Sequence, residues 1–138
     1  GLDYALSMEG SLKLKEVSYI HSESYAAGEL KHGTISLIDE DVPVIAVATQ
    51  TGIIPKTISN VVEVKSRGAK VILVCTDACA RELKDGVADY VIEIPHTDEL
   101  LMPITAVVPL QILAYYTSIN RGIDPDKPKN LAKSVTVE

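Results

Sequence analysis

The residues of this sequence that could do chemistry are one acid, one histidine and two lysines. Lys13 and Glu16 are three residues apart, so on a helix they share one face. A carboxylate held beside an ammonium group can act as a general base, but most such pairs are surface ion pairs. His32 precedes Gly33, where it could shuttle a proton or simply be a favourable charge at a helix end. Lys133, in the carboxyl-terminal tail, could form a Schiff base with a carbonyl, or be a solvated side chain.

The remaining polar motifs give weaker signals for ligand binding. Residues 49–52, Thr-Gln-Thr-Gly, follow an apolar stretch, and hydroxyls at a helix start can hold a phosphate, although such loops are common. Cys75 and Cys79 form a single C-x3-C pair, which has no second pair to complete a zinc site. His21 and His96 have no sequence neighbours that suggest metal binding. These residues therefore predict no metal site.

The composition is that of one folded, acidic domain. Of the 138 residues, 46% are hydrophobic and 23% are charged, so the chain can bury a core. The 13 Lys and Arg against 19 Asp and Glu give a formal charge of −6, which excludes the basic surface that a general nucleic-acid binder needs. The first residues show no secretory leader and the cysteines are too few for a disulfide framework. We therefore expect a cytoplasmic protein.

One uncharged stretch, residues 100–120, is long enough by itself to admit a membrane-spanning helix. Pro103, Pro109 and Gln111 interrupt it with several hydroxyls, and no basic flank sets an orientation. We expect instead a helix that is buried on most sides by its own domain or by a second subunit, and no membrane partner.

Helical and strand patterns alternate along the chain. We expect helices at 3–27 and 55–67, from Thr76 or Asp77 to Leu83, and from Thr97 or Asp98 to Asn120, with strands at 43–48, 70–75 and 89–94. This alternation predicts an α/β fold, a parallel sheet with helices on both faces. No linker or repeat divides residues 1–138, so we expect a single domain with a tail at 123–138.

Three stretches of the chain resemble one enzyme family. They are residues 9–21 (EGSLKLKEVSYIH), 24–33 (SYAAGELKHG) and 126–138 (DKPKNLAKSVTVE), of which the last is the most specific. They look like the carboxyl-terminal part of the isomerising glutamine–fructose-6-phosphate aminotransferases, also called glucosamine-6-phosphate synthases. The resemblance covers essentially the whole chain. It implies the second of two SIS (sugar isomerase) subdomains, with a flavodoxin-like three-layer sandwich.

The resemblance also implies a reaction and roles for residues. The family takes ammonia from glutamine and converts fructose 6-phosphate to glucosamine 6-phosphate for hexosamine biosynthesis, without a metal or organic cofactor. The glutamate matching Glu16 moves a proton between C1 and C2 of the open-chain sugar, and the lysine matching Lys13 supports this chemistry. The lysine matching Lys133 forms an imine with the sugar carbonyl. The histidine matching His32 assists ring opening and reaches the active site of the neighbouring subunit, so the resemblance implies a homodimer.

Parts of the family pattern lie outside these residues. The glutaminase domain is absent, as is the first SIS subdomain with its phosphate-holding loop, so we expect this chain alone to be inactive. Phosphate binding is not assigned to residues 49–52, and Thr34 stands where the family usually has proline. Two alternatives stay open. They are a sugar-phosphate-binding SIS module without turnover, and a related deaminase or deglycase that runs the chemistry in reverse.

Overall fold

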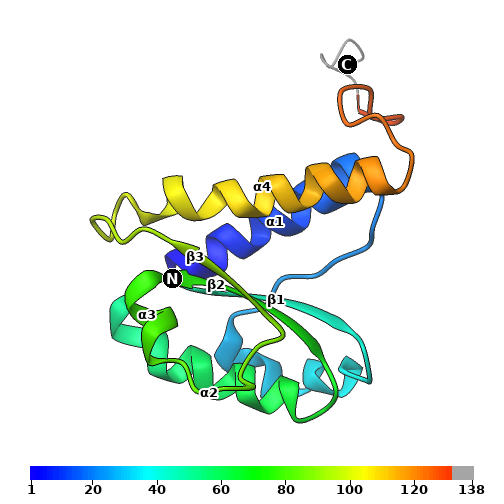
Figure 1. Cartoon of the computed structure of the whole chain (residues 1–138). Helices are drawn as coiled ribbons and strands as arrows, with labels where there is room; N and C mark the ends of the chain where they lie inside the picture. Colours follow the sequence, from blue (N-terminus) through cyan, green and yellow to red (C-terminus); the bar gives the residue numbers. More distant parts are fainter. Residues whose placement is uncertain (132–138) are drawn as a thin grey trace.

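The computed structural model describes residues 1–131, which form a parallel sheet with helices on both faces (Figure 1). The strands are β1 (Pro43–Ala48), β2 (Lys70–Thr76) and β3 (Tyr90–Ile94), in the order β1-β2-β3. The helices are α1 (Leu2–Ser18), α2 (Ile54–Lys65), α3 (Asp77–Glu82) and α4 (Met102–Asn120), with the short 3-10 helices η1 (Ala27–His32), η2 (Thr34–Leu37) and η3 (Thr51–Ile53). The predicted fold class and all three strands are confirmed.

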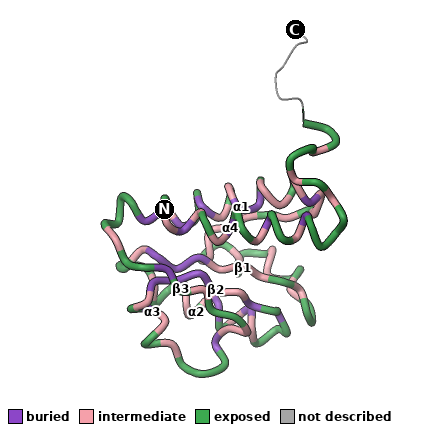
Figure 2. The backbone as a smooth tube through the Cα atoms, turned by 45° about the horizontal axis from the view of Figure 1, so that its top comes forward, coloured by how far each residue is buried: buried purple, intermediate pink, exposed green. Residues whose placement is uncertain are grey.

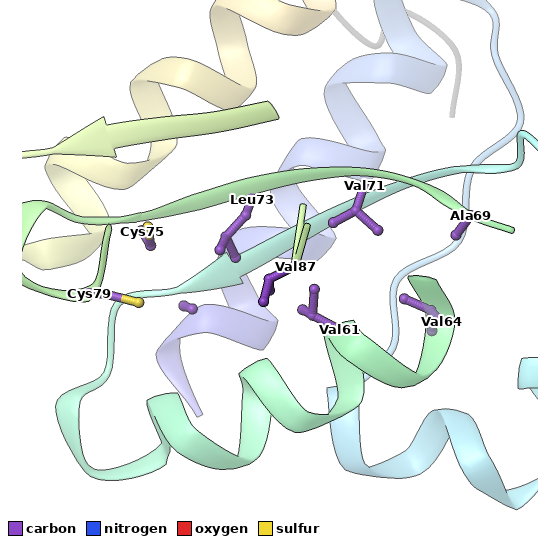
Figure 3. Packing of buried hydrophobic residues seen from close by; sticks show 9 residues of the cluster. Val61, Val64, Ala69, Val71, Leu73, Cys75, Cys79 and Val87 are labelled. Atoms are coloured by element: carbon purple, nitrogen blue, oxygen red, sulfur yellow. The ribbon is translucent and has the colours of Figure 1, made fainter. Parts of the chain in front are cut away.

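The side chains of β2 alternate between the two faces of the sheet. Val71, Leu73 and Cys75 point towards α2 and α3, whereas Val74 belongs to the cluster on the α1 and α4 side. Figure 3 shows Val61 and Val64 of α2 packed towards Val71 and Leu73. Because both faces are covered, the middle strand is apolar along almost its whole length, as buried parallel strands are.

Helices α1 and α4 lie side by side over the other face of the sheet (Figures 1 and 2). The buried residues of α4 recur at every fourth position and form one stripe: Met102, Ala106, Leu110, Ala114 and Ser118. On α1, a Cβ added to Gly10 would lie 3.1 Å from the Leu110 Cδ1, so the missing side chain lets the two helices approach closely.

The uncharged helix α4 was expected to be buried on most sides by its own domain or by a second subunit. The first alternative was wrong, because the domain covers only one face of α4. The opposite face stays exposed, with Ile104 at 65% and Tyr116 at 59% of their full accessibility. Among residues 1–131, α4 is the one helix long and apolar enough to cross a membrane by length and composition. Its buried stripe nevertheless packs on α1 and the sheet as the inner face of a domain helix does.

Two helix boundaries differ by more than two residues from those predicted. The first helix ends at Ser18 rather than at residue 27, because Tyr19 takes a left-handed conformation (φ 55°, ψ 29°). The chain then runs back along the helix, where Ser22 and Ser11 exchange hydrogen bonds between their side chains and backbone carbonyls. The last helix begins at Met102, after a turn in which the Leu101 N–H donates to the Asp98 carbonyl. Neither contact leaves a periodic pattern in the sequence.

Candidate active site

The Lys13 and Glu16 side chains meet on the carboxyl-terminal half of α1. The Lys13 Nζ lies 2.6 Å from the Glu16 Oε2 and 3.5 Å from the Glu9 Oε1. Both members of the closer pair are partly buried, with 31% and 26% of their side chains exposed. The hydrogen bond to Glu16 raises the pKa of Lys13 above its ordinary value, and Glu9 adds to the effect.

This arrangement divides the chemistry between the two groups. Lys13 stays an ammonium ion, and a protonated amine has no lone pair for attack on a carbonyl. Glu16 is held by one oxygen, which leaves its other oxygen able to accept a proton. The pair is therefore suited to a fixed general base beside a positive charge, and Lys13 is not suited to forming an imine.

Helix α1 is fixed at its amino end by a buried carboxylate that the sequence did not single out. Asp3, 7% exposed, accepts hydrogen bonds from the Thr49 N–H at 3.0 Å, the Thr49 hydroxyl at 2.5 Å and the Gln50 N–H at 3.3 Å. In return the Asp3 N–H donates to the Gln50 side chain. The only local signal in the sequence for these hydrogen bonds between Asp3 and residues 49–50 was an acid in the first turn of a helix.

The hydrogen bonds to Asp3 change the interpretation of residues 49–52. Thr49 is 1% exposed, and its hydroxyl and N–H both donate to Asp3. These two groups are therefore committed to holding the sheet and α1 together. The exposed part of the loop, Thr51 and Gly52, begins η3.

His32 is exposed at the end of η1, and its described contacts do not include the Lys13–Glu16 pair. Within residues 1–131, no hydrogen bond or ion pair joins His32 to Lys13 or Glu16. Its side chain instead lines a groove of about 620 Å³, shared with Tyr25 and residues 44–47 of β1. The structure thus brings together Lys13 and Glu16 but does not bring His32 to them in one copy of the chain.

The start of the tail is attached to the carboxyl end of α1 at two points. The fully buried Ser118 hydroxyl lies 2.8 Å from the Val17 carbonyl and 3.1 Å from the Ile123 carbonyl. Further on, the Lys129 N–H donates to the Tyr19 hydroxyl at 2.5 Å. Lys133 lies outside the described residues, so its predicted role stays a prediction.

Three comparisons with known proteins identify the family and the fold of this chain. A family model of the SIS domain matches residues 1–121. The chain is 57% identical over 138 residues to the isomerising glutamine–fructose-6-phosphate aminotransferase of Clostridium perfringens, and 56% identical to that of Caldanaerobacter subterraneus. All of the chain is covered in both cases, but only 23% and 22% of those proteins. The chain thus spans less than a quarter of the length of these relatives.

Among solved structures, the carboxyl-terminal domain of glucosamine-fructose-6-phosphate aminotransferase from Francisella tularensis matches with a TM-score of 0.85 and 40% identity, over 90% of this chain and 34% of that one. A glucosamine-6-phosphate deaminase from Thermotoga maritima matches with a TM-score of 0.73 and 30% identity, over 96% of this chain and 37% of that one.

Proposed function

Because this chain belongs to the family of SIS domains, we propose that it is the carboxyl-terminal isomerase subdomain of an isomerising glutamine–fructose-6-phosphate aminotransferase. The whole protein then converts fructose 6-phosphate and glutamine-derived ammonia to glucosamine 6-phosphate. Identity above one half along the entire chain to enzymes of that name supports this. A cytoplasmic location fits the two buried free thiols, Cys75 and Cys79.

The observation that carries the proposal is the Glu16 carboxylate held 2.6 Å from the Lys13 ammonium on α1. Exchange of a ketose and an aldose needs one base that removes a proton from one sugar carbon and returns it to the next. A single carboxylate on a rigid helix can serve both carbons, and the adjacent ammonium stabilises negative charge that develops on the sugar. We expect Glu16→Gln to abolish sugar turnover and leave folding intact.

A lysine imine is the second part of the proposed mechanism. The neutral Lys133 amine adds to the sugar carbonyl and water leaves, which gives an imine. Its nitrogen takes up a proton, and the resulting cationic nitrogen acidifies the neighbouring C–H bond. Lys13 is unsuited to this step because its pKa is raised. In the intact enzyme, borohydride should reduce the imine and link the sugar to Lys133, and Lys133→Ala should abolish turnover. Capture of the sugar on any other lysine contradicts the assignment.

His32 is proposed to act in the site of a second copy of the chain, in a homodimer. Its exposure and its lack of contact with the Lys13–Glu16 pair within residues 1–131 support a role outside its own copy. The exposed apolar face of α1 and α4, which includes Met8, Leu12 and Ile104, offers a surface for association. Light scattering that gives a strict monomer at high concentration contradicts this arrangement.

A complementation experiment tests the shared site directly. Glu16→Gln and His32→Ala are each expected to inactivate their own homodimer. Random mixing makes half of the dimers mixed, and each mixed dimer keeps one intact site of two, so about a quarter of wild-type activity should return. No recovery on mixing would place both residues in the site of one chain.

The chain alone is proposed to be inactive. Within residues 1–131 β1 pairs only with β2, so its outer edge borders the groove with unpaired backbone groups. Another part of a longer protein could cover this edge and complete the site. Formation of glucosamine 6-phosphate from fructose 6-phosphate and ammonia by these 138 residues alone would contradict the proposal.

The similarity to a solved glucosamine-6-phosphate deaminase supports a second candidate. A deaminase needs the same carboxylate base, because it runs the proton transfer in the opposite direction. The two activities separate in one assay of the intact protein. A synthase makes glucosamine 6-phosphate only when glutamine or ammonia is supplied, whereas a deaminase releases ammonia from glucosamine 6-phosphate. A binding module would show calorimetric binding of that sugar phosphate and neither reaction.

A further inference from the structure

The last turn of α1, which carries Glu16, ends in carbonyl groups that no N–H of the same helix can reach. The last four carbonyls of an α-helix have no partner within it, and helix ends fray where nothing else satisfies them. Val17 directly follows Glu16 and is the next-to-last residue of α1. Its carbonyl therefore needs a donor from outside the helix if the turn that carries Glu16 is to stay closed.

A hydroxyl from the far end of the chain supplies this donor. Ser118 lies in the last turn of α4 and is fully buried, and its hydroxyl lies 2.8 Å from the Val17 carbonyl, 101 positions away. The Ile123 carbonyl lies farther from the same hydroxyl, at 3.1 Å. A serine hydroxyl has one proton, and O–H···O hydrogen bonds usually measure about 2.5–3.0 Å. The Ser118 hydroxyl therefore donates to Val17.

The position of this hydroxyl is itself fixed by the turn that ends α4. The Ile123 N–H donates to the Ser118 carbonyl at 3.0 Å, and the Arg121 N–H donates to it at 3.1 Å. Farther along the same pair of helices, the Leu110 side chain packs against Gly10 of α1. The two helices are thus held together in the middle by apolar packing and at their carboxyl ends by the Ser118 hydroxyl.

We propose that Ser118 is a positioning residue for the isomerising step, because it closes the last turn of α1 and so holds the Glu16 carboxylate beside the Lys13 ammonium. This inference rests on the proposed function of Glu16. The 2.6 Å contact between Lys13 and Glu16 joins residues three positions apart, which meet on one face only while the turn between them is helical. Ser118 is buried and acts through Glu16, without touching the sugar.

The size of the effect follows from the loss of one hydrogen bond. Ser118→Ala removes the hydroxyl and adds no atoms. We expect the amides of residues 16–18 to exchange with solvent about five-fold faster in this variant, which corresponds to about 1 kcal/mol at about 1.4 kcal/mol per factor of ten. The same factor is the upper limit for the fall in the isomerising rate, and it is reached when the turn is open in most molecules of the variant.

The test is Ser118→Ala in the intact aminotransferase, with incorporation of solvent deuterium into the sugar phosphate as the measure of proton transfer. We expect this rate and kcat to fall about two- to five-fold, and the KM for fructose 6-phosphate to stay unchanged. The matched control is Thr117→Val, because the Thr117 hydroxyl donates to the Leu113 carbonyl within α4. A second control, Leu110→Ala, weakens the same helix pair away from the last turn and should leave kcat unchanged in the folded protein.

Each outcome bears on one part of the inference. Unchanged amide exchange in Ser118→Ala overturns the role of the hydroxyl in closing the turn, whatever reaction the enzyme catalyses. Faster exchange with unchanged deuterium incorporation overturns the positioning role. An equal fall of kcat in Leu110→Ala also overturns it, since the loss would then follow stability alone. A wild type that incorporates no deuterium into the sugar phosphate overturns the proposed base, and this inference with it, so the two failures are distinguishable.

Discussion

Replacement of Asp3 by alanine should destabilise the domain by about 3 kcal/mol. The substitution leaves the Thr49 N–H and hydroxyl without acceptors, and Thr49 is 1% exposed. Each buried polar group left unsatisfied costs roughly 1–3 kcal/mol, and water entering the small space left by the carboxylate offsets part of this. Loss of a negative charge in the first turn of α1 adds about 0.3–1 kcal/mol.

The assay is urea unfolding of Asp3→Ala followed by circular dichroism, with the free energy of unfolding taken at an unchanged denaturant slope. Asp3→Asn is the matched control, because it keeps the shape and one acceptor oxygen and should lose roughly half as much. The double variant with Thr49→Val should show strong coupling, since the two substitutions remove one shared contact. A loss below about 1 kcal/mol for Asp3→Ala would refute the reasoning that Asp3 holds α1 to the sheet.

Three further outcomes are expected. The hydrogen bonds to Asp89 from Lys65 and from the Val71 N–H lower the pKa of Asp89 below its ordinary value of 3.8. The contribution of Asp89 to stability is therefore complete above pH 3.8 and is lost as the pH falls through the lowered pKa. The stability difference between wild type and Asp89→Asn, followed by thermal unfolding, should therefore shrink in acid; a constant difference would contradict this. Burial raises the pKa of Cys75 to about 12, so Ellman's reagent should react slowly at pH 8 until urea unfolds the chain, and rapid labelling of the folded protein would be inconsistent with the structure. Leu110→Ala, at 3% exposure between α1 and α4, should lower the free energy of unfolding by about 2–5 kcal/mol in urea, and a change under 1 kcal/mol would show that this helix contact is dispensable.

Much of the architecture could be predicted from the order of residues alone. Mainly apolar runs at 43–48 and 70–75 indicate buried strands, the pattern at 89–94 predicts a third strand, and all three are strands of the sheet. Pro55 and Gly68 bracket α2 as expected, because proline suits a first helical turn and glycine suits the left-handed turn after one. These signals are local, so they act before any long-range contact forms.

The candidate site, too, could be predicted from the sequence only in part. The spacing of Lys13 and Glu16 places them on one helical face, and the structure confirms their contact. The spacing alone did not decide whether Lys13 and Glu16 form a surface ion pair or whether Glu16 is a catalytic base. The resemblance of the motifs to the family favoured the catalytic base. The catalytic roles of Glu16, His32, Lys13 and Lys133 remain predictions.

Other features depend on contacts between residues far apart in the chain. The end of α1 is set by Tyr19 and by the Ser11–Ser22 contacts, and the hold on its beginning comes from the pairing of Asp3 with Thr49, 46 positions away. The sequence determined the elements, because helical and strand periods, caps and breakers are properties of neighbouring residues. Only the tertiary structure decided which groups meet and which face of α4 stays exposed, because those depend on how the sheet brings distant elements together.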